Sequence, residues 1–259
     1  VGTGGDGSGT FNVSTTTSFV VAGAGIPVAK HGNRAISSSC GSADVLEALG
    51  VDLSMPAEKV AGCVQTVGIG FLFAPMLHGA MKHAIGPRRE IGIRTIFNIL
   101  GPMTNPAGAN VQLTGVFARE LTETLADVLV RLGMKRTLVV WGEGNIDEMT
   151  ITGVSHIADA HDGKVETYTI EPEDVGLKRA TLDDIRGGAT AEESAVQVRE
   201  VLGGAEGPKL DMVLLNGGAA LMAAGKADDI KGGVVLAREI IASGAALRKL
   251  DELVAFCKA

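Results

Sequence analysis

The sequence is poor in aromatic residues, in cysteine and in long apolar runs. One Trp and one Tyr leave little surface for stacking on bases, and a net charge of −7 would repel a phosphodiester backbone, so nucleic acid is not an expected partner. The three cysteines are widely spaced and form no CxxC, which argues against a disulfide framework or a zinc site and favours the reducing cytoplasm. The apolar stretches around 19–29 and 68–77 are broken by Gly or Pro and are too short for a membrane span, and no signal-peptide pattern is present.

Glycine and apolar residues, in contrast, are abundant. The 36 glycines are about twice the usual share. With 259 residues, of which 46% are hydrophobic, the chain can bury the core of one large α/β domain that carries a smaller insertion.

The glycines are concentrated at the start, where residues 1–15 read VGTGGDGSGTFNVST. Glycine adopts positive φ angles at little cost, so such a loop can point several backbone N–H groups at one anion. Residues 14–24 contain no helix breaker before Gly23, and we expect a helix to begin near residues 12–14 with its positive end toward that anion. The segment therefore favours a phosphorylated sugar as ligand. A glycine-rich surface turn is the alternative that the residues alone leave open.

A second polar segment, residues 30–44 with the sequence KHGNRAISSSCGSAD, lies between a predicted strand at 26–29 and a predicted helix at 43–50. Strand-to-helix loops of parallel sheets gather at the carboxyl ends of the strands, where ligands bind. Lys30 would supply a positive charge for phosphate, and the serines would supply neutral donors. The alternative is a solvated loop.

The motifs GTGGD, TFNVST, KHGNRAISS and GSAD, in this order and spacing, resemble those of anthranilate phosphoribosyltransferase. This family joins anthranilate to phosphoribosyl pyrophosphate in tryptophan biosynthesis. The similarity continues through GIRTIFNILGPMTNPAG (92–108) and NIDEMT (145–150), so it covers essentially the whole chain. The related pyrimidine nucleoside phosphorylases share the fold and some of the loops, but we do not expect FNILGP or NIDEMT in them.

The predicted fold class is α/β, with a large, mainly parallel sheet flanked by helices as in nucleoside phosphorylases and phosphoribosyltransferases. Strands at 111–117 and 136–142 flank a helix at 120–133, and residues 154–170 read as a hairpin that turns at Asp162-Gly163. Helical periodicity over 54–85 predicts a helical insertion at 54–88, which divides the α/β domain into 1–53 and 89–259.

The resemblance implies that this insertion belongs to a small α domain, whose N-terminal helical segment we expect to be missing because Val1 directly precedes the glycine loop. It also implies a homodimer for the full-length family.

Asp147 and Glu148 are adjacent acids just past the strand at 136–142. Their mutual repulsion is relieved by Mg²⁺, a hard cation that shares carboxylate oxygens with phosphate and water. A solvated acidic turn is the alternative for an isolated pair. The resemblance implies that both acids bind Mg²⁺ and that Ser14 contributes to a second metal position, giving two ions.

The resemblance also implies the substrate-binding residues. For phosphoribosyl pyrophosphate they are Gly2, Gly5, Asp6, Thr10, Asn12, Val13, Ser14, Thr15, Lys30, His31, Gly32, Asn33, Arg34, Ser37, Ser38 and Ser42. For anthranilate they are Gly2, His31, Asn33, His78 and Arg88, of which Arg88 suits the carboxylate through its guanidinium fork.

One departure concerns the serine loop, which commonly reads SSKSGSAD in the family and SSSCGSAD here. Ser39 thus replaces a lysine and Cys40 a serine. The loss of one positive charge is expected to weaken donor binding if that lysine holds phosphate.

The expected chemistry needs no covalent nucleophile. Breaking the bond between the ribose anomeric carbon and pyrophosphate develops negative charge on the leaving group, which the loops and magnesium neutralise. The uncharged aromatic amine of anthranilate attacks once it is positioned. Two alternatives stay open: a pyrimidine nucleoside phosphorylase, and a module that binds phosphoribosyl ligands without turnover.

Overall fold

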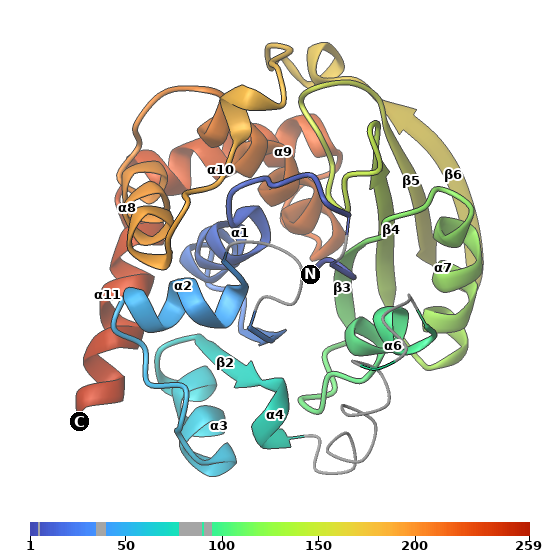
Figure 1. Ribbon diagram of the computed structural model, residues 1–259. Coiled ribbons are helices and arrows are strands. Elements are labelled where there is room, and N and C mark those ends of the chain that lie inside the picture. The colour runs from blue at the N-terminus through green and yellow to red at the C-terminus, as the bar shows by residue number, and fades with distance from the viewer. Residues whose placement is uncertain (5, 35–39, 78–89, 91–94) are drawn as a thin grey trace.

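The chain folds into helices packed around two pieces of β-sheet (Figure 1). The computed structural model describes all residues except 5, 35–39, 78–89 and 91–94. Its elements are α1 (Val13–Gly23), β1 (Val28–Gly32), α2 (Ser42–Ala48), α3 (Ala57–Thr66), β2 (Ile69–Phe73), α4 (Ala74–Leu77), α6 (Phe97–Met103), β3 (Val111–Gly115), α7 (Leu121–Arg131), β4 (Arg136–Gly142), β5 (Ser155–His161), β6 (Lys164–Ile170), the 3₁₀ helices η2 (Pro172–Val175) and η3 (Asp183–Ile185), α8 (Ala191–Leu202), α9 (Pro208–Ala223), α10 (Ile230–Ala242) and α11 (Ala245–Lys258).

The sheet pieces have the orders β1-β2 and β3-β4-β5-β6. The predicted α/β class is confirmed, but pairing among the described residues is mixed rather than mainly parallel. β1–β2 and β3–β4 are parallel, whereas β4–β5 and β5–β6 are antiparallel. The connections agree with this pairing, because residues 143–154 between β4 and β5 contain no crossover helix and a two-residue turn joins β5 to β6. Parallel neighbours usually need such a crossover helix, whereas a tight turn returns the chain antiparallel.

Several predicted elements occur where they were expected. The strand at 136–142 is β4, the hairpin turns at Asp162-Gly163 with positive φ at both residues, and α1 begins at Val13. The prediction of helices throughout 54–85 is wrong for Ile69–Phe73, which forms β2 beside β1. A short, fully apolar run has no periodicity that separates a buried strand from a buried helix. Residues 78–85 lie outside the described part, and the division into domains stays a prediction.

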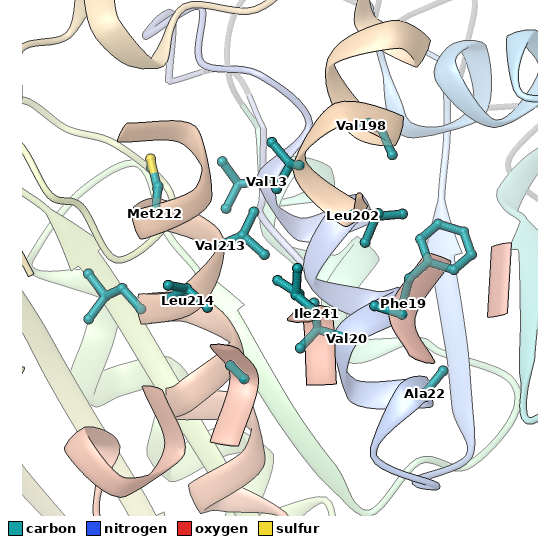
Figure 2. Packing of buried hydrophobic residues seen from close by; sticks show 14 of the residues in the cluster. Val13, Phe19, Val20, Ala22, Val198, Leu202, Met212, Val213, Leu214 and Ile241 are labelled. Atoms are coloured by element: carbon teal, nitrogen blue, oxygen red, sulfur yellow. The ribbon is translucent and has the colours of Figure 1, made fainter. Parts of the chain in front are cut away.

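The core explains why the start of α1 is fixed in position. Leu138 and Val140 of β4 belong to the large cluster that includes α1, α9 and α10, whereas Val139 faces α7 on the other side of the sheet. This alternation follows from the two-residue period of a strand. Figure 2 shows Val13 and Val20 of α1 among side chains from the neighbouring helices. Burial of these residues holds the first turn of α1 against the rest of the core.

No helix in the described ranges is long and apolar enough to cross a membrane.

Candidate active site

Four segments converge at the first turn of α1: the glycine loop, α1 itself, β1 and the loop after β4. The backbone N–H of Gly4 donates to Oδ2 of Asp147 at 2.6 Å, and the backbone N–H of Ser14 donates to Oε1 of Glu148 at 3.1 Å. Lys30 on β1 donates from Nζ to Oγ of Ser14 at 3.3 Å. The fold therefore brings together the glycine loop, the lysine and the acidic pair that the sequence singled out.

Glycine is needed at two positions because the loop that carries Asp147 and Glu148, the acidic loop, approaches closely there. Gly2 pairs with Gly115 at the end of β3, in a parallel bridge. A Cβ on Gly2 would lie 2.3 Å from Oδ2 of Asp147, and a Cβ on Gly115 would lie 1.5 Å from the carbonyl oxygen of Asp147. Neither position has room for a side chain, so the acidic loop rests directly on the backbone of β3 and of the glycine loop.

The acidic pair is electrostatically unfavourable by itself. Burial, and after it the charge of Asp6, raise the pKa of Asp147 to about 7. Burial, and after it the charge of Asp147, raise the pKa of Glu148 well above its usual range. Oε2 of Glu148 is buried and has no hydrogen-bond partner among the described residues. A cation binds favourably to a buried carboxylate oxygen that has no hydrogen-bond donor, because it supplies the missing partner.

The residues present fit Mg²⁺. The oxygens of Asp147, Glu148 and Ser14 are hard donors, and the unpartnered Oε2 of Glu148 is free to serve as a ligand. In the part of the chain that the structure describes, no three His, Cys, Asp or Glu side chains form a metal-holding group of their own. An ion here would complete its shell with water or phosphate oxygens, as Mg²⁺ at phosphoryl sites commonly does.

Lys30 is the cation beside this pair. Its side chain is 8% exposed, and burial lowers its pKa to about 8, with the charge of Glu148 acting in the opposite direction. The ammonium group is therefore mainly protonated near neutral pH. A buried cation of this kind interacts more strongly with phosphate than an exposed lysine does, because water screens it less.

Acid titration of Asp147 gives a test of this electrostatic description. A carboxyl with a raised pKa binds its proton more tightly in the folded state, so its contribution to stability is lost as the pH rises from about 4 through about 7. We expect the free energy of unfolding of the metal-free wild type, measured in urea, to fall relative to that of Asp147→Asn over this range. Mg²⁺ added at high pH should reverse the fall, and parallel curves for the two proteins would contradict the assigned burial.

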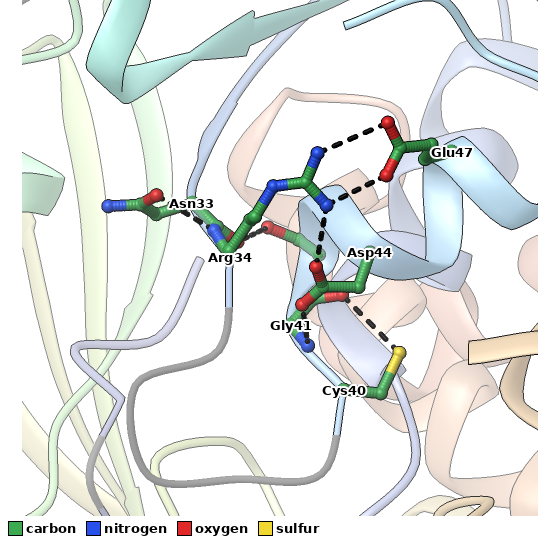
Figure 3. A network of polar contacts seen from close by, with 7 residues as sticks. Asn33, Arg34, Cys40, Gly41, Asp44 and Glu47 are labelled. Carbon is green, nitrogen blue, oxygen red and sulfur yellow. Dashed lines mark hydrogen bonds and ion pairs between the residues drawn. The ribbon is translucent and has the colours of Figure 1, made fainter. Parts of the chain in front are cut away.

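The ends of the serine loop are held by a polar network (Figure 3). Arg34 forms ion pairs with Asp44 and Glu47 of α2, and these bonds raise the pKa of its guanidinium. Asp44 also accepts from the backbone N–H of Gly41, and the N–H of Ala43 donates to the carbonyl of Asn33. Arg34, predicted to bind phosphoribosyl pyrophosphate, is thus bound to α2 in this structure.

The other predicted site residues fall into two groups. Near the convergence point, His31 is buried with Nδ1 3.2 Å from the carbonyl oxygen of Gly101, and a Cβ on Gly32 would lie 2.2 Å from Oγ of Ser42. The second group lies in the chain before and at the start of α1. Thr10 forms an antiparallel bridge with Arg186, Asn12 donates from Nδ2 to the carbonyl of Cys40, and Val13 and Thr15 are buried in the core.

The remaining predicted site residues, Gly5, Ser37, Ser38, His78 and Arg88, lie outside the described residues.

A cavity of about 510 Å³ is lined by residues of α1, β1 and β3 and by the acidic pair, among them Ser14, Lys30, Asp147 and Glu148. Its lining also includes residues 26–29 and 111–113. The acidic pair, Lys30 and Ser14 therefore line one shared cavity.

Sequence reasoning missed Asn216, which lies within α9 and bonds to the backbone next to the acidic pair. The available signal was a single asparagine inside the apolar run KLDMVLLNGGAALMAAG. A buried amide must find partners, and here it finds them on a loop 67 residues away in sequence.

Comparisons with known proteins agree with this geometry. Residues 1–247 match the family model described as "Glycosyl transferase family, a/b domain". The chain is 73% identical over 256 residues to the anthranilate phosphoribosyltransferase of Desulfotalea psychrophila, a match that covers 99% of the chain and 74% of that protein. It is 58% identical over 255 residues to that of Moorella thermoacetica, covering 98% and 75%.

Solved structures are similar over the same span. The crystal structure of anthranilate phosphoribosyltransferase from Thermus thermophilus superposes with a TM-score of 0.94 at 50% identity and covers 100% of this chain and 77% of that one. The enzyme from Saccharomyces cerevisiae, in complex with PRPP and Mg, gives a TM-score of 0.90 at 32% identity and covers 99% and 72%. The chain therefore belongs to the anthranilate phosphoribosyltransferase family.

Proposed function

We propose that the chain transfers the phosphoribosyl group of 5-phosphoribosyl 1-pyrophosphate to the amine of anthranilate, giving N-(5-phosphoribosyl)anthranilate and pyrophosphate in tryptophan biosynthesis. The observation that carries the proposal is the buried acidic pair with the unpartnered Oε2 of Glu148, beside Lys30 and the glycine loop. The names of the relatives support it, as does the yeast neighbour in complex with PRPP and Mg.

The leaving pyrophosphate would be bound by groups at the start of α1. Backbone N–H groups of the glycine loop would donate to phosphate oxygens, and Lys30 would provide a positive charge. Asp147 and Glu148 would hold Mg²⁺, with Ser14 at a second ion; when bound, the metal neutralises the negative charge that develops on pyrophosphate. Ser14 suits this role because its Oγ accepts a hydrogen bond from Lys30 while its backbone N–H donates to Glu148.

Anthranilate would be positioned rather than activated. Its aromatic amine is uncharged near neutral pH and needs no strong base, so the acceleration comes from holding it against the anomeric carbon. Gly2, His31 and Asn33 are the proposed contacts, together with His78 and Arg88. We propose no covalent nucleophile, and Cys40 is a packing residue whose thiol pKa is raised, mainly by burial.

The test is the fluorescence of anthranilate over time with phosphoribosyl pyrophosphate and Mg²⁺. We expect fluorescence to fall with protein present, to stop falling when EDTA chelates the metal, and to fall again when excess Mg²⁺ is returned, because the leaving group then regains its neutralising charge. An unchanged signal in all three conditions would refute the transferase.

Each of the two alternatives would leave the fluorescence of anthranilate unchanged, and a further assay identifies each of them. A pyrimidine nucleoside phosphorylase would release ribose 1-phosphate from a nucleoside and phosphate and leave anthranilate untouched. A non-catalytic module would bind phosphoribosyl pyrophosphate in calorimetry without forming product.

A homodimer and a cytoplasmic location are proposed on the family resemblance and, for the location, on the three unpaired cysteines.

A further inference from the structure

All the described hydrogen bonds of the Asn216 side chain are to backbone groups. Oδ1 accepts from the N–H of Met149 at 3.1 Å, and Nδ2 donates to the carbonyl of Met149 and to that of Met212, both at 2.9 Å. The residue is 3% exposed. One buried amide thus holds both polar backbone groups of the residue that directly follows Glu148.

The residue that precedes the acidic pair, Ile146, is also held by two hydrogen bonds. Gly142 at the end of β4 and Ile146 exchange two backbone hydrogen bonds, of 2.8 and 3.0 Å. Asp147 and Glu148 therefore lie between two anchored residues, Ile146 and Met149. The first anchor consists of backbone alone, whereas the second depends on one side chain contributed by α9.

The chemistry of an amide fits this second anchor. Asn provides an acceptor and two donors in one plane, which is what a peptide N–H and a neighbouring carbonyl require together. An aliphatic residue of similar size at position 216 would fill the space and leave both groups of Met149 unpaired. The loop would then be free to rotate the carboxylate of Glu148 away from its neighbours.

We propose that Asn216 is a positioning residue that fixes the orientation of Asp147 and Glu148 and thereby sets the affinity of this site for magnesium. The inference rests on the proposed function, because it takes the acidic pair as the metal site. In other proteins, groups that hydrogen-bond to metal ligands and hold their orientation contribute about ten- to a hundredfold to the metal affinity.

The experiment compares Asn216→Leu with Leu221→Ala, a control in the same helix whose side chain is fully buried and has no described bond to the acidic loop. Binding of Mn²⁺ in the presence of inorganic pyrophosphate is measured by electron paramagnetic resonance, without substrates. We expect Asn216→Leu to bind Mn²⁺ at least about tenfold more weakly than the wild type. Leu221→Ala should lose stability but keep the wild-type affinity. Asn216→Ser serves as a milder variant if the leucine protein does not fold.

Turnover gives the second readout. The Mg²⁺ concentration for half-maximal rate should rise by a similar factor in Asn216→Leu while the KM for anthranilate stays near that of the wild type. Wild-type metal affinity in the folded Asn216 variants would overturn the inference, as would an equal loss in Leu221→Ala. An inactive wild type would refute the proposed function alone, since Mn²⁺ binding still decides the role of Asn216.

Discussion

Replacing Asp147 and Glu148 together by Asn and Gln is expected to abolish turnover and to stabilise the metal-free protein. Both effects follow from the same charges. Removing the proposed ligands of the neutralising cation should lower kcat/KM by at least about a thousandfold, or about 4 kcal/mol in the activation free energy. Removing two buried, mutually repelling carboxylates relieves the burial and repulsion that raise the pKa of each. The amide replacements keep oxygen acceptors for the backbone N–H groups of Gly4 and Ser14.

The measurements are the anthranilate fluorescence assay and urea unfolding without metal. Asp127→Asn is the matched control, because Asp127 is a half-exposed acid of α7 that pairs with Arg131. It should change neither quantity by much, since exposed ion pairs contribute little to stability. Turnover near the wild-type rate in the Asn/Gln double variant would show that the acidic pair is not the metal site. An unchanged unfolding midpoint would contradict the described burial.

Gly115→Ala is expected to lower the free energy of unfolding more than any other glycine-to-alanine substitution at this site. The new Cβ would lie 1.5 Å from the backbone oxygen of Asp147 and 2.2 Å from its carbonyl carbon, so backbone has to move. The N–H and C=O of Gly115 are bonded to residues 1 and 3, and β3 is paired with β4 on its other side. We expect a loss of at least about 4 kcal/mol in urea unfolding, at the upper end of single substitutions, with little folded protein at 37 °C.

Gly62→Ala is the control for this substitution. Gly62 lies inside α3, and a Cβ there would have Phe256 at 4.0 Å as its nearest neighbour. Alanine is the better helix former, so this variant should be neutral or up to about 1 kcal/mol more stable. If Gly115→Ala unfolded at the same urea concentration as the wild type, the close contact between β3 and the acidic loop would be refuted.

Local sequence was sufficient for most of the framework. The regular alternation of apolar segments and turns predicted β4, α7 and the β5–β6 hairpin. The motifs predicted the family and singled out the glycine loop and the acidic pair, two segments that the fold brings into contact. Local sequence failed at β2, where a five-residue apolar run carries no information on whether it pairs with β1 or coils into a helix.

Other features depend on residues that the sequence separates widely. Asp6 and Asp147 repel each other across 141 positions, and the lowered pKa of Lys30 follows from burial by other elements. The need for glycine at 115 arises because β3 passes directly beneath the acidic loop.

The sequence by itself therefore determined most of the elements, the family and the residue types available for catalysis, because these depend on patterns among near neighbours. The tertiary structure alone decided that a buried oxygen of Glu148 finds no donor among the described residues and that Asn216 holds the next peptide in place. Both depend on distances between segments that meet only when the core forms, and electrostatic and hydrogen-bond energies change steeply with those distances and with burial.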